Sequence, residues 1–173
     1  SISYHLNGGV NDGSNPVSYT SDNPYLSLKN PTKSNYTFDG WYTSSTYAAK
    51  LTSSTKCVGN LNLYAKWTPT QYTVQLDVNG GNQLSQSKYT ATVETTGMGL
   101  PMSTRDGYTF TGWYTQKTGG DKVSSLNYVT QNMTLYARWE KNPEPHVHSY
   151  KTLVENVKAT CNSDGHTTYR CAC

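Results

Sequence analysis

The residues best suited to chemistry lie near the C-terminal end of the chain. Cys161, Cys171 and Cys173, together with His146 or His148, would form a Cys3His set of the kind that binds zinc. The spacing of these cysteines lacks the Cys-x2-Cys pair that is typical of structural zinc sites. We therefore expect no metal site. A zinc site formed by these five residues is kept as the alternative hypothesis.

The same cysteines raise the question of a disulfide bond. Cys171 and Cys173 are two residues apart, so on one strand they point to the same face and cannot comfortably bridge each other. One of them could pair with Cys161 across the turn expected at Asp164-Gly165. The pairing among the three cysteines stays open.

Catalytic motifs are missing from the rest of the sequence. The 11 acidic residues are scattered, and there is no Gly-x-Ser-x-Gly elbow, glycine-rich phosphate loop or His-Glu-x-x-His motif. His5 is not repeated either, because the matching position of the repeat described below is Asp77. We expect no catalytic residue, no cofactor and no enzyme activity in this segment.

The composition narrows the class of protein. The 173 residues include 15 Tyr and 4 Trp, only 14% are charged, and the net charge is +3. Tyr and Thr favour strands, and no apolar run approaches the roughly 20 residues that span a bilayer. The small positive charge is not clustered, so nucleic acid is not an expected partner. The absence of an initiator Met and of a signal-peptide pattern predicts an excised or mature segment of a larger polypeptide.

An internal repeat organises most of the chain. Four motifs recur 72 positions later with no net gap, which predicts two tandem copies. They are Asn7-Gly8-Gly9 and Asn79-Gly80-Gly81, Tyr36-Thr37-Phe38 and Tyr108-Thr109-Phe110, Gly40-Trp41-Tyr42-Thr43 and Gly112-Trp113-Tyr114-Thr115, and Leu63-Tyr64-Ala65-Lys66-Trp67 and Leu135-Tyr136-Ala137-Arg138-Trp139.

The sequence of each copy predicts a small set of strands. Apolar residues alternate at the start and end of each copy, and this period of two predicts half-buried strands. Asn-Gly-Gly supplies residues that accept positive φ, which predicts a tight turn or hairpin after the first strand. The middle motifs predict a strand that carries Phe38 and Trp41 inward. Residues 23–29 and 92–100 fit either a short helix or a crossover loop.

The aromatic residues divide into two groups. We interpret the four tryptophans as core anchors, at positions Trp41, Trp67, Trp113 and Trp139. The tyrosines at opposite parity predict an exposed stripe that could stack on or dock a ligand, although exposed Tyr also simply favours strands. The candidate binding residues are Tyr42, Tyr64, Tyr114 and Tyr136, beside Lys66 and Arg138.

Cys57 has a plainer explanation than the other cysteines. Its counterpart in the second copy is Val129. A cysteine that replaces valine in a repeat most simply fills a small apolar site in the core. We expect Cys57 to be buried rather than bridged to the tail.

Together these motifs resemble the Listeria–Bacteroides repeat, which is related to the internalin B-repeat. The resemblance covers about residues 1–140 and implies a mainly β fold (α+β at most), with two tandem β-grasp-like (ubiquitin-like) modules and a short β-hairpin-like tail. The implied divisions are residues 1–69, 70–140 and 141–173. The short linker at residues 68–71 predicts a restricted orientation of the two modules. The tail resembles the opening of another short repeat of such proteins, marked by its His, Tyr and Cys residues.

The resemblance also implies a setting. Such modules are strung along bacterial cell-surface and secreted proteins, where they act as spacers, stalks or adhesion units without catalytic residues. The expected location is extracellular or at the cell surface, associated with the cell wall. Candidate partners are a host or matrix protein or a glycan. The alternative function is a carbohydrate-binding module that uses the exposed tyrosines, either by itself or appended to an extracellular enzyme.

Overall fold

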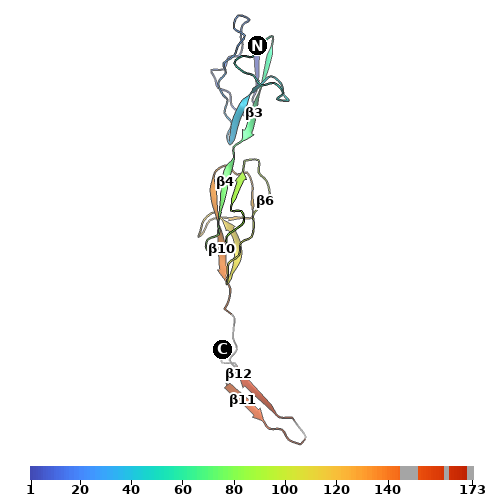
Figure 1. Ribbon diagram of the computed structural model, residues 1–173, viewed down its shortest axis with the longest axis vertical. Coiled ribbons are helices and arrows are strands. Elements are labelled where there is room, and N and C mark those ends of the chain that lie inside the picture. Colours follow the sequence, from blue (N-terminus) through green and yellow to red (C-terminus); the bar gives the residue numbers. More distant parts are fainter. Residues whose placement is uncertain (145–151, 162–163, 171–173) are drawn as a thin grey trace. The chain divides into compact units, whose positions relative to one another are not determined.

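The computed structural model describes residues 1–144, 152–161 and 164–170. The chain forms two compact units, Ser1–Glu140 and Lys141–Cys173. Across the described residues the regular structure consists of strands, as Figure 1 shows, which confirms the predicted mainly β fold. None of the described residues belongs to a helix long and apolar enough to cross a membrane.

The first copy is built on a sheet of three strands. They are β1 (Ile2–His5), β2 (Tyr36–Tyr42) and β3 (Leu61–Pro69), in the order β1-β3-β2. The first strand runs parallel to the last, with Ile2 opposite Leu61 and Tyr4 opposite Leu63. Strand β2 runs antiparallel to β3. The central strand β3 therefore joins the two ends of the copy.

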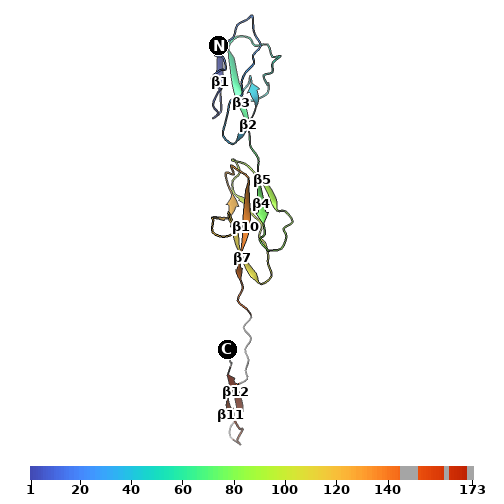
Figure 2. The ribbon, with the colours of Figure 1, turned by 90° about the vertical axis from the view of Figure 1, so that its left-hand side faces the viewer.

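The second copy repeats this arrangement and extends it. Its sheet has the order β5-β4-β10-β7-β8, and four of these strands (β4, β5, β7 and β10) are labelled in Figure 2. The strands are β4 (Tyr72–Asp77), β5 (Lys88–Ala91), β7 (Tyr108–Tyr114), β8 (Lys122–Val123) and β10 (Met133–Lys141). A separate short ladder pairs β6 (Met98–Gly99) with β9 (Ser125–Leu126). The parallel register of β4 and β10 matches that of β1 and β3 residue for residue.

The two segments predicted as a short helix or a crossover loop are loops. Residues 23–29 contain no regular element beyond a single bridge at Asn23, and residues 92–100 contain only the short strand β6. No described helix therefore packs on either sheet. The β-grasp assignment stays a prediction, because a covering helix is the part of that fold that the described residues lack.

Each copy has its own apolar core on its central strand. Leu63 and Ala65 in β3, and Leu135 and Ala137 in β10, are fully buried. The prediction that the tryptophans anchor the core is confirmed: Trp41 is 5% exposed and Trp113 3%. The other two, Trp67 and Trp139, are partly buried and pack against the same clusters.

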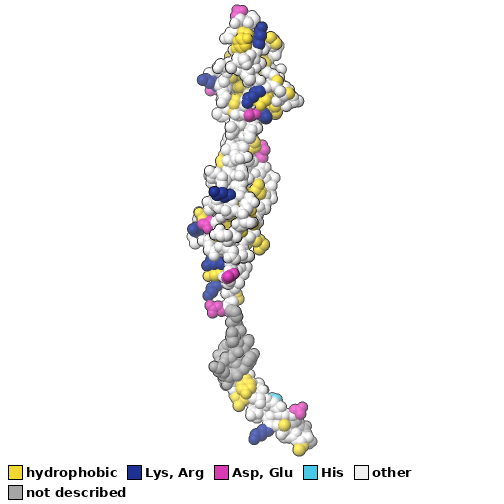
Figure 3. Space-filling model, in the orientation of Figure 1, with side chains coloured by type: hydrophobic (Ala, Val, Ile, Leu, Met, Phe, Trp, Pro, Cys, Tyr) yellow, Lys and Arg dark blue, Asp and Glu magenta, His cyan; other side chains and the backbone are white. Residues whose placement is uncertain are grey.

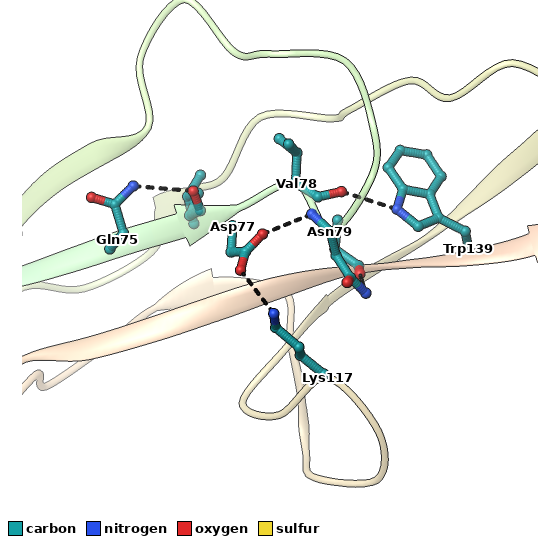
Figure 4. A network of polar contacts seen from close by, with 8 residues as sticks. Gln75, Asp77, Val78, Asn79, Lys117 and Trp139 are labelled. Atoms are coloured by element: carbon teal, nitrogen blue, oxygen red, sulfur yellow. Dashed lines mark hydrogen bonds and ion pairs between the residues drawn. The ribbon is translucent and has the colours of Figure 1, made fainter.

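The Asn-Gly-Gly motif forms a turn that holds the second tryptophan of each copy. Asn7 and Gly8 have φ angles of 49° and 82°, as the predicted turn requires. A Cβ atom on Gly9 would overlap Cζ2 of Trp67. The indole Nε1 donates a hydrogen bond to the carbonyl of Leu6 at 2.9 Å. In the second copy Trp139 Nε1 donates the equivalent hydrogen bond to the carbonyl of Val78, at 3.1 Å (Figure 4).

A β-bulge lets Phe38 and Trp41 face the same core although they are three residues apart. The register between β2 and β3 shifts between Phe38 and Gly40, so the alternation of the strand is reset there. Gly40 at this bulge has a φ of 147°, which favours glycine. Phe38 and Trp41 then meet with ring centroids 5.4 Å apart.

Cys57 lies in the core of the first copy, as its valine counterpart predicted. It is a buried free thiol, and Val129 is buried at the corresponding place in the second copy. Burial raises the pKa of the Cys57 thiol, which disfavours the reactive thiolate.

The second unit contains a two-stranded hairpin. Strand β11 (Thr152–Val157) runs antiparallel to β12 (His166–Arg170), which agrees with the predicted hairpin-like tail. Leu153, Val154 and Tyr169 on these strands are more than half exposed.

On the molecular face of Figure 3, charged side chains are spread out rather than gathered in one patch.

Candidate functional site

The candidate tyrosines of the first copy lie next to each other across two strands. Tyr42 of β2 is directly opposite Tyr64 of β3, and His5 of β1 is opposite Tyr64 on its other side. The rings of His5 and Tyr64 stack with centroids 4.4 Å apart and an interplanar angle of 8°. One face of Tyr64 is therefore occupied by the protein itself.

A set of polar side chains surrounds Tyr42. The Tyr42 hydroxyl donates a hydrogen bond to Asp39 Oδ2 at 2.9 Å, and the Nζ atoms of Lys66 and Lys50 lie 3.3 and 3.7 Å from the Asp39 carboxylate. The ring of Tyr47 meets that of Tyr42 edge-on at 5.4 Å. We call these five residues the Asp39 cluster.

The charged forms of Asp39 and Lys66 stabilise each other. Hydrogen bonds from Tyr42 and Lys66 hold the pKa of Asp39 below its ordinary value of 3.8. The hydrogen bond to Asp39 in turn raises the pKa of Lys66. Lys66 Nζ also lies 5.3 Å from the centre of the Tyr42 ring, which is within range of a cation–π contact.

We expect Asp39→Asn to destabilise the first copy at pH 7 by a small but measurable amount that disappears in acid. Because folding lowers the pKa of Asp39, its ionised form stabilises the fold above pH 3.8, and that contribution is lost as the pH falls through the lowered pKa. Thermal unfolding of the variant and wild type at pH 7 and pH 2 measures this difference. The control is Thr111→Asn at the matching position of the second copy, and equal effects of the two changes at both pH values would contradict the expectation.

The second copy places different partners around the equivalent tyrosines. The guanidinium carbon of Arg138 lies 4.1 Å from the centre of the Tyr114 ring, and Arg138 also donates a hydrogen bond to the carbonyl of Gln116 at 3.2 Å. Lys117 Nζ lies 5.4 Å from the centre of the Tyr136 ring. Lys117 also pairs with Asp77 at 3.6 Å, as Figure 4 shows.

The expected exposed stripe of tyrosines is wrong for Tyr42. This side chain is only 7% exposed, and Tyr64, Tyr114 and Tyr136 are half-buried. The parity of the strands places these tyrosines on the face opposite the core, but the loop after β2 brings Tyr47 and Lys50 over Tyr42. Lys66 and Arg138 lie against rings of the set, where the sequence placed them. Ligand binding by these six residues stays a prediction.

Sequence reasoning missed Asp39, Tyr47 and Lys50, although they complete the cluster of the first copy. Asp39 fills the variable position of the motif, and its counterpart in the second copy is Thr111, so the repeat alone gives it no weight. Asp77 was detectable, because it replaces His5 on the strand beside the second tyrosine of its copy.

The alternative metal ligands cannot be placed together. Cys161 is exposed, while His146, His148, Cys171 and Cys173 lie outside the described residues. Within residues 1–144, 152–161 and 164–170, no three His, Cys, Asp or Glu side chains are grouped as metal ligands would be. The open question of a pairing between Cys161 and Cys171 or Cys173 also involves residues outside the described ones.

Comparisons with known proteins agree with the duplicated architecture. The sequence profile of the Listeria-Bacteroides repeat domain matches residues 1–66 and again residues 72–138. Internalin H of Listeria monocytogenes is 38% identical over 120 residues, which is 66% of this chain and 21% of that protein. Two proteins of Evansella cellulosilytica are also similar. A putative membrane protein is 30% identical over 145 residues, 82% of this chain and 21% of its own length. A putative Gly-rich membrane protein is 33% identical over 116 residues, 65% of this chain and 13% of its own length.

This chain therefore spans about a fifth or less of the length of these relatives. The profile matches cover most of residues 1–138. Each contains the Asn-Gly-Gly turn and the first tryptophan of its copy, Trp41 or Trp113, and each ends one residue before the second tryptophan. The chain belongs to the Listeria-Bacteroides repeat family and carries two tandem copies of the repeat.

Proposed function

We propose that the chain is a non-catalytic repeat segment of a bacterial cell-surface or secreted protein, where it acts as a spacer and as a protein-interaction module. Its similarity to Internalin H and to two putative membrane proteins supports a surface location, and cell-wall association is part of the proposal. The proposed modules are residues 1–69 and 70–140, followed by the segment 141–173. No described cluster of side chains argues for catalysis in this proposal.

The junction between the two copies carries the spacer role. The backbone N–H of Thr70 donates to the carbonyl of Asn35 at 2.9 Å, and the Tyr72 hydroxyl donates to Asn35 Oδ1 at 3.0 Å. The Tyr36 hydroxyl donates to Glu94 Oε1 at 2.8 Å, which raises the pKa of Tyr36. A spacer needs such contacts, because a linker without them would let adjacent modules reorient freely.

Residual dipolar couplings test this role. We expect the two copies of the wild-type chain to share one alignment tensor. The double variant Asn35→Gly/Tyr36→Phe should give two different tensors, because it removes the two side-chain hydrogen bonds between the copies, Tyr72 to Asn35 and Tyr36 to Glu94. Glycine keeps the positive φ of residue 35. Tyr108→Phe, the counterpart of Tyr36→Phe, is the control. Separate tensors in the wild-type chain would refute a spacer of defined orientation.

The carbohydrate-binding alternative is tested on the same protein. A glycan array probed with the full chain and with Tyr64→Ala and Tyr136→Ala separates the two functions. We expect a blank array with all three proteins folded, because His5 and Lys117 already lie against these rings. Reproducible binding by the wild-type chain that both variants lose would replace the interaction role with carbohydrate recognition.

A further inference from the structure

A pocket of about 240 Å³ opens in the first copy beside Trp41. Its apolar wall joins residues from the loop before β2, from β2 itself and from the segment after it. These residues are Leu26, Leu28, Phe38, Trp41 and Leu51. Its rim is polar but uncharged, with Ser27, Asn30, Thr52 and Ser53 among the lining residues. The lining therefore suits an uncharged group that presents both apolar and polar surface, as a peptide does.

The second copy buries a leucine in the corresponding region. The five positions 72 residues further on belong to one core cluster, as the five pocket residues do in the first copy, but the cluster of the second copy also includes Leu126. They are Met98, Leu100, Phe110, Trp113 and Val123. Leu126 itself is only 2% exposed. Its counterpart in the first copy is Ser54, which is exposed and directly follows the pocket residue Ser53, so the first copy has no apolar side chain at this position.

The two copies also differ in the backbone pairing next to the pocket. In the second copy Leu126 is delivered by β9, which pairs antiparallel with β6 through Met98 and Gly99. The matching residues of the first copy are Leu26 and Ser27, which form no ladder. Within residues 1–144, no backbone hydrogen bond joins either of them to another segment. Their N–H and C=O groups are available to a strand added from outside.

We propose that this pocket of the first copy binds an extended peptide of a partner protein, inserting one branched aliphatic side chain where the second copy holds its own leucine. The strand β9 defines the chemistry of this partner, since it supplies both a short antiparallel backbone segment and Leu126. The inference rests on the proposed interaction role and specifies the class of partner. Stacking of a sugar on Trp41 is disfavoured, because that ring is 5% exposed.

A peptide with the sequence of residues 122–128, Lys-Val-Ser-Ser-Leu-Asn-Tyr, is the probe. Capped at both ends, it is titrated to millimolar concentration into the full 15N-labelled chain while amide and indole NMR signals are followed. We expect shifts at Leu26, Ser27 and the Trp41 indole. The same peptide with serine in place of leucine should bind at least tenfold more weakly. Absence of shifts, or equal shifts with both peptides, would overturn the proposal.

Two variants of the protein show whether the pocket itself is responsible. Ser54→Leu restores the residue type of the second copy, so it should raise Tm by a few degrees and weaken peptide binding at least tenfold. Ser45→Leu adds the same side chain at an exposed position that does not line the pocket and should leave binding unchanged. Retained binding by Ser54→Leu would overturn the pocket assignment. The residual dipolar couplings of the wild-type chain test the spacer role without the peptide. A failure of peptide binding therefore leaves the result for the spacer role unchanged.

Discussion

Replacing Trp113 with alanine should lower the free energy of unfolding of the second copy by about 3–5 kcal/mol. The side chain is 3% exposed, and its loss leaves a cavity in a cluster that includes Leu126 and Phe110. The indole Nε1 also donates a hydrogen bond to the carbonyl of Pro101 at 2.7 Å, and alanine leaves that acceptor without its donor. Native-state hydrogen exchange of the β10 amides measures the stability of this copy.

Trp41→Ala is the matched variant in the first copy and should cost less. The equivalent hydrogen bond, from Trp41 Nε1 to the carbonyl of Lys29, is 3.5 Å long, so little hydrogen bonding is lost. The pocket already lies beside this ring, so fewer packing contacts disappear with it. Exchange of the β3 amides reports on this copy. A loss in the first copy as large as that in the second would contradict this account of the two cores.

Gly81→Ala should destabilise the second copy by about 1–3 kcal/mol through overpacking. A Cβ atom at this position would overlap Cζ2 of Trp139 and lie 3.0 Å from the carbonyl oxygen of Thr104. The tryptophan cannot move without breaking its hydrogen bond to the carbonyl of Val78. Urea unfolding followed by tryptophan fluorescence measures the effect.

The control for this change is Gly99→Ala. No heavy atom lies within 4 Å of a Cβ built on Gly99, and its backbone is not in the left-handed region. Alanine there should leave the midpoint of urea unfolding nearly unchanged or raise it slightly. If both alanines shift the midpoint equally, contact with Trp139 is not what selects glycine at position 81.

The repeat made much of the fold predictable. Positions that are apolar in both copies identify the core, whereas a position that is apolar in one copy alone does not. The comparison correctly placed Cys57 in the core of the first copy, because its counterpart in the second copy is Val129. Alternation identified the first and last strands of each copy. It could not show that a bulge at Gly40 resets the parity of β2, because a bulge depends on the pairing between strands.

The candidate site was predictable only in part. Alternation shows the face on which Tyr42 lies, but not whether a loop covers that face. The covering residues Tyr47 and Lys50 come from a loop whose path depends on contacts with Asp39 and Lys66. The pocket was equally hidden, although the replacement of Leu126 by Ser54 is visible in the sequence. Its meaning requires the five neighbours that only the fold brings together.

The parallel pairing of the first and last strands determines how each copy responds to tension. The chain enters the first copy at the start of β1 and leaves it at the end of β3, which are opposite ends of one pair of parallel strands. A pull on both ends slides these strands past each other, so the hydrogen bonds between them are loaded together in shear. A hairpin such as β11 and β12 instead opens one bond at a time when its ends are pulled apart. In the proposed spacer, β3 and β10 are therefore the strands that transmit a pulling force through the two copies.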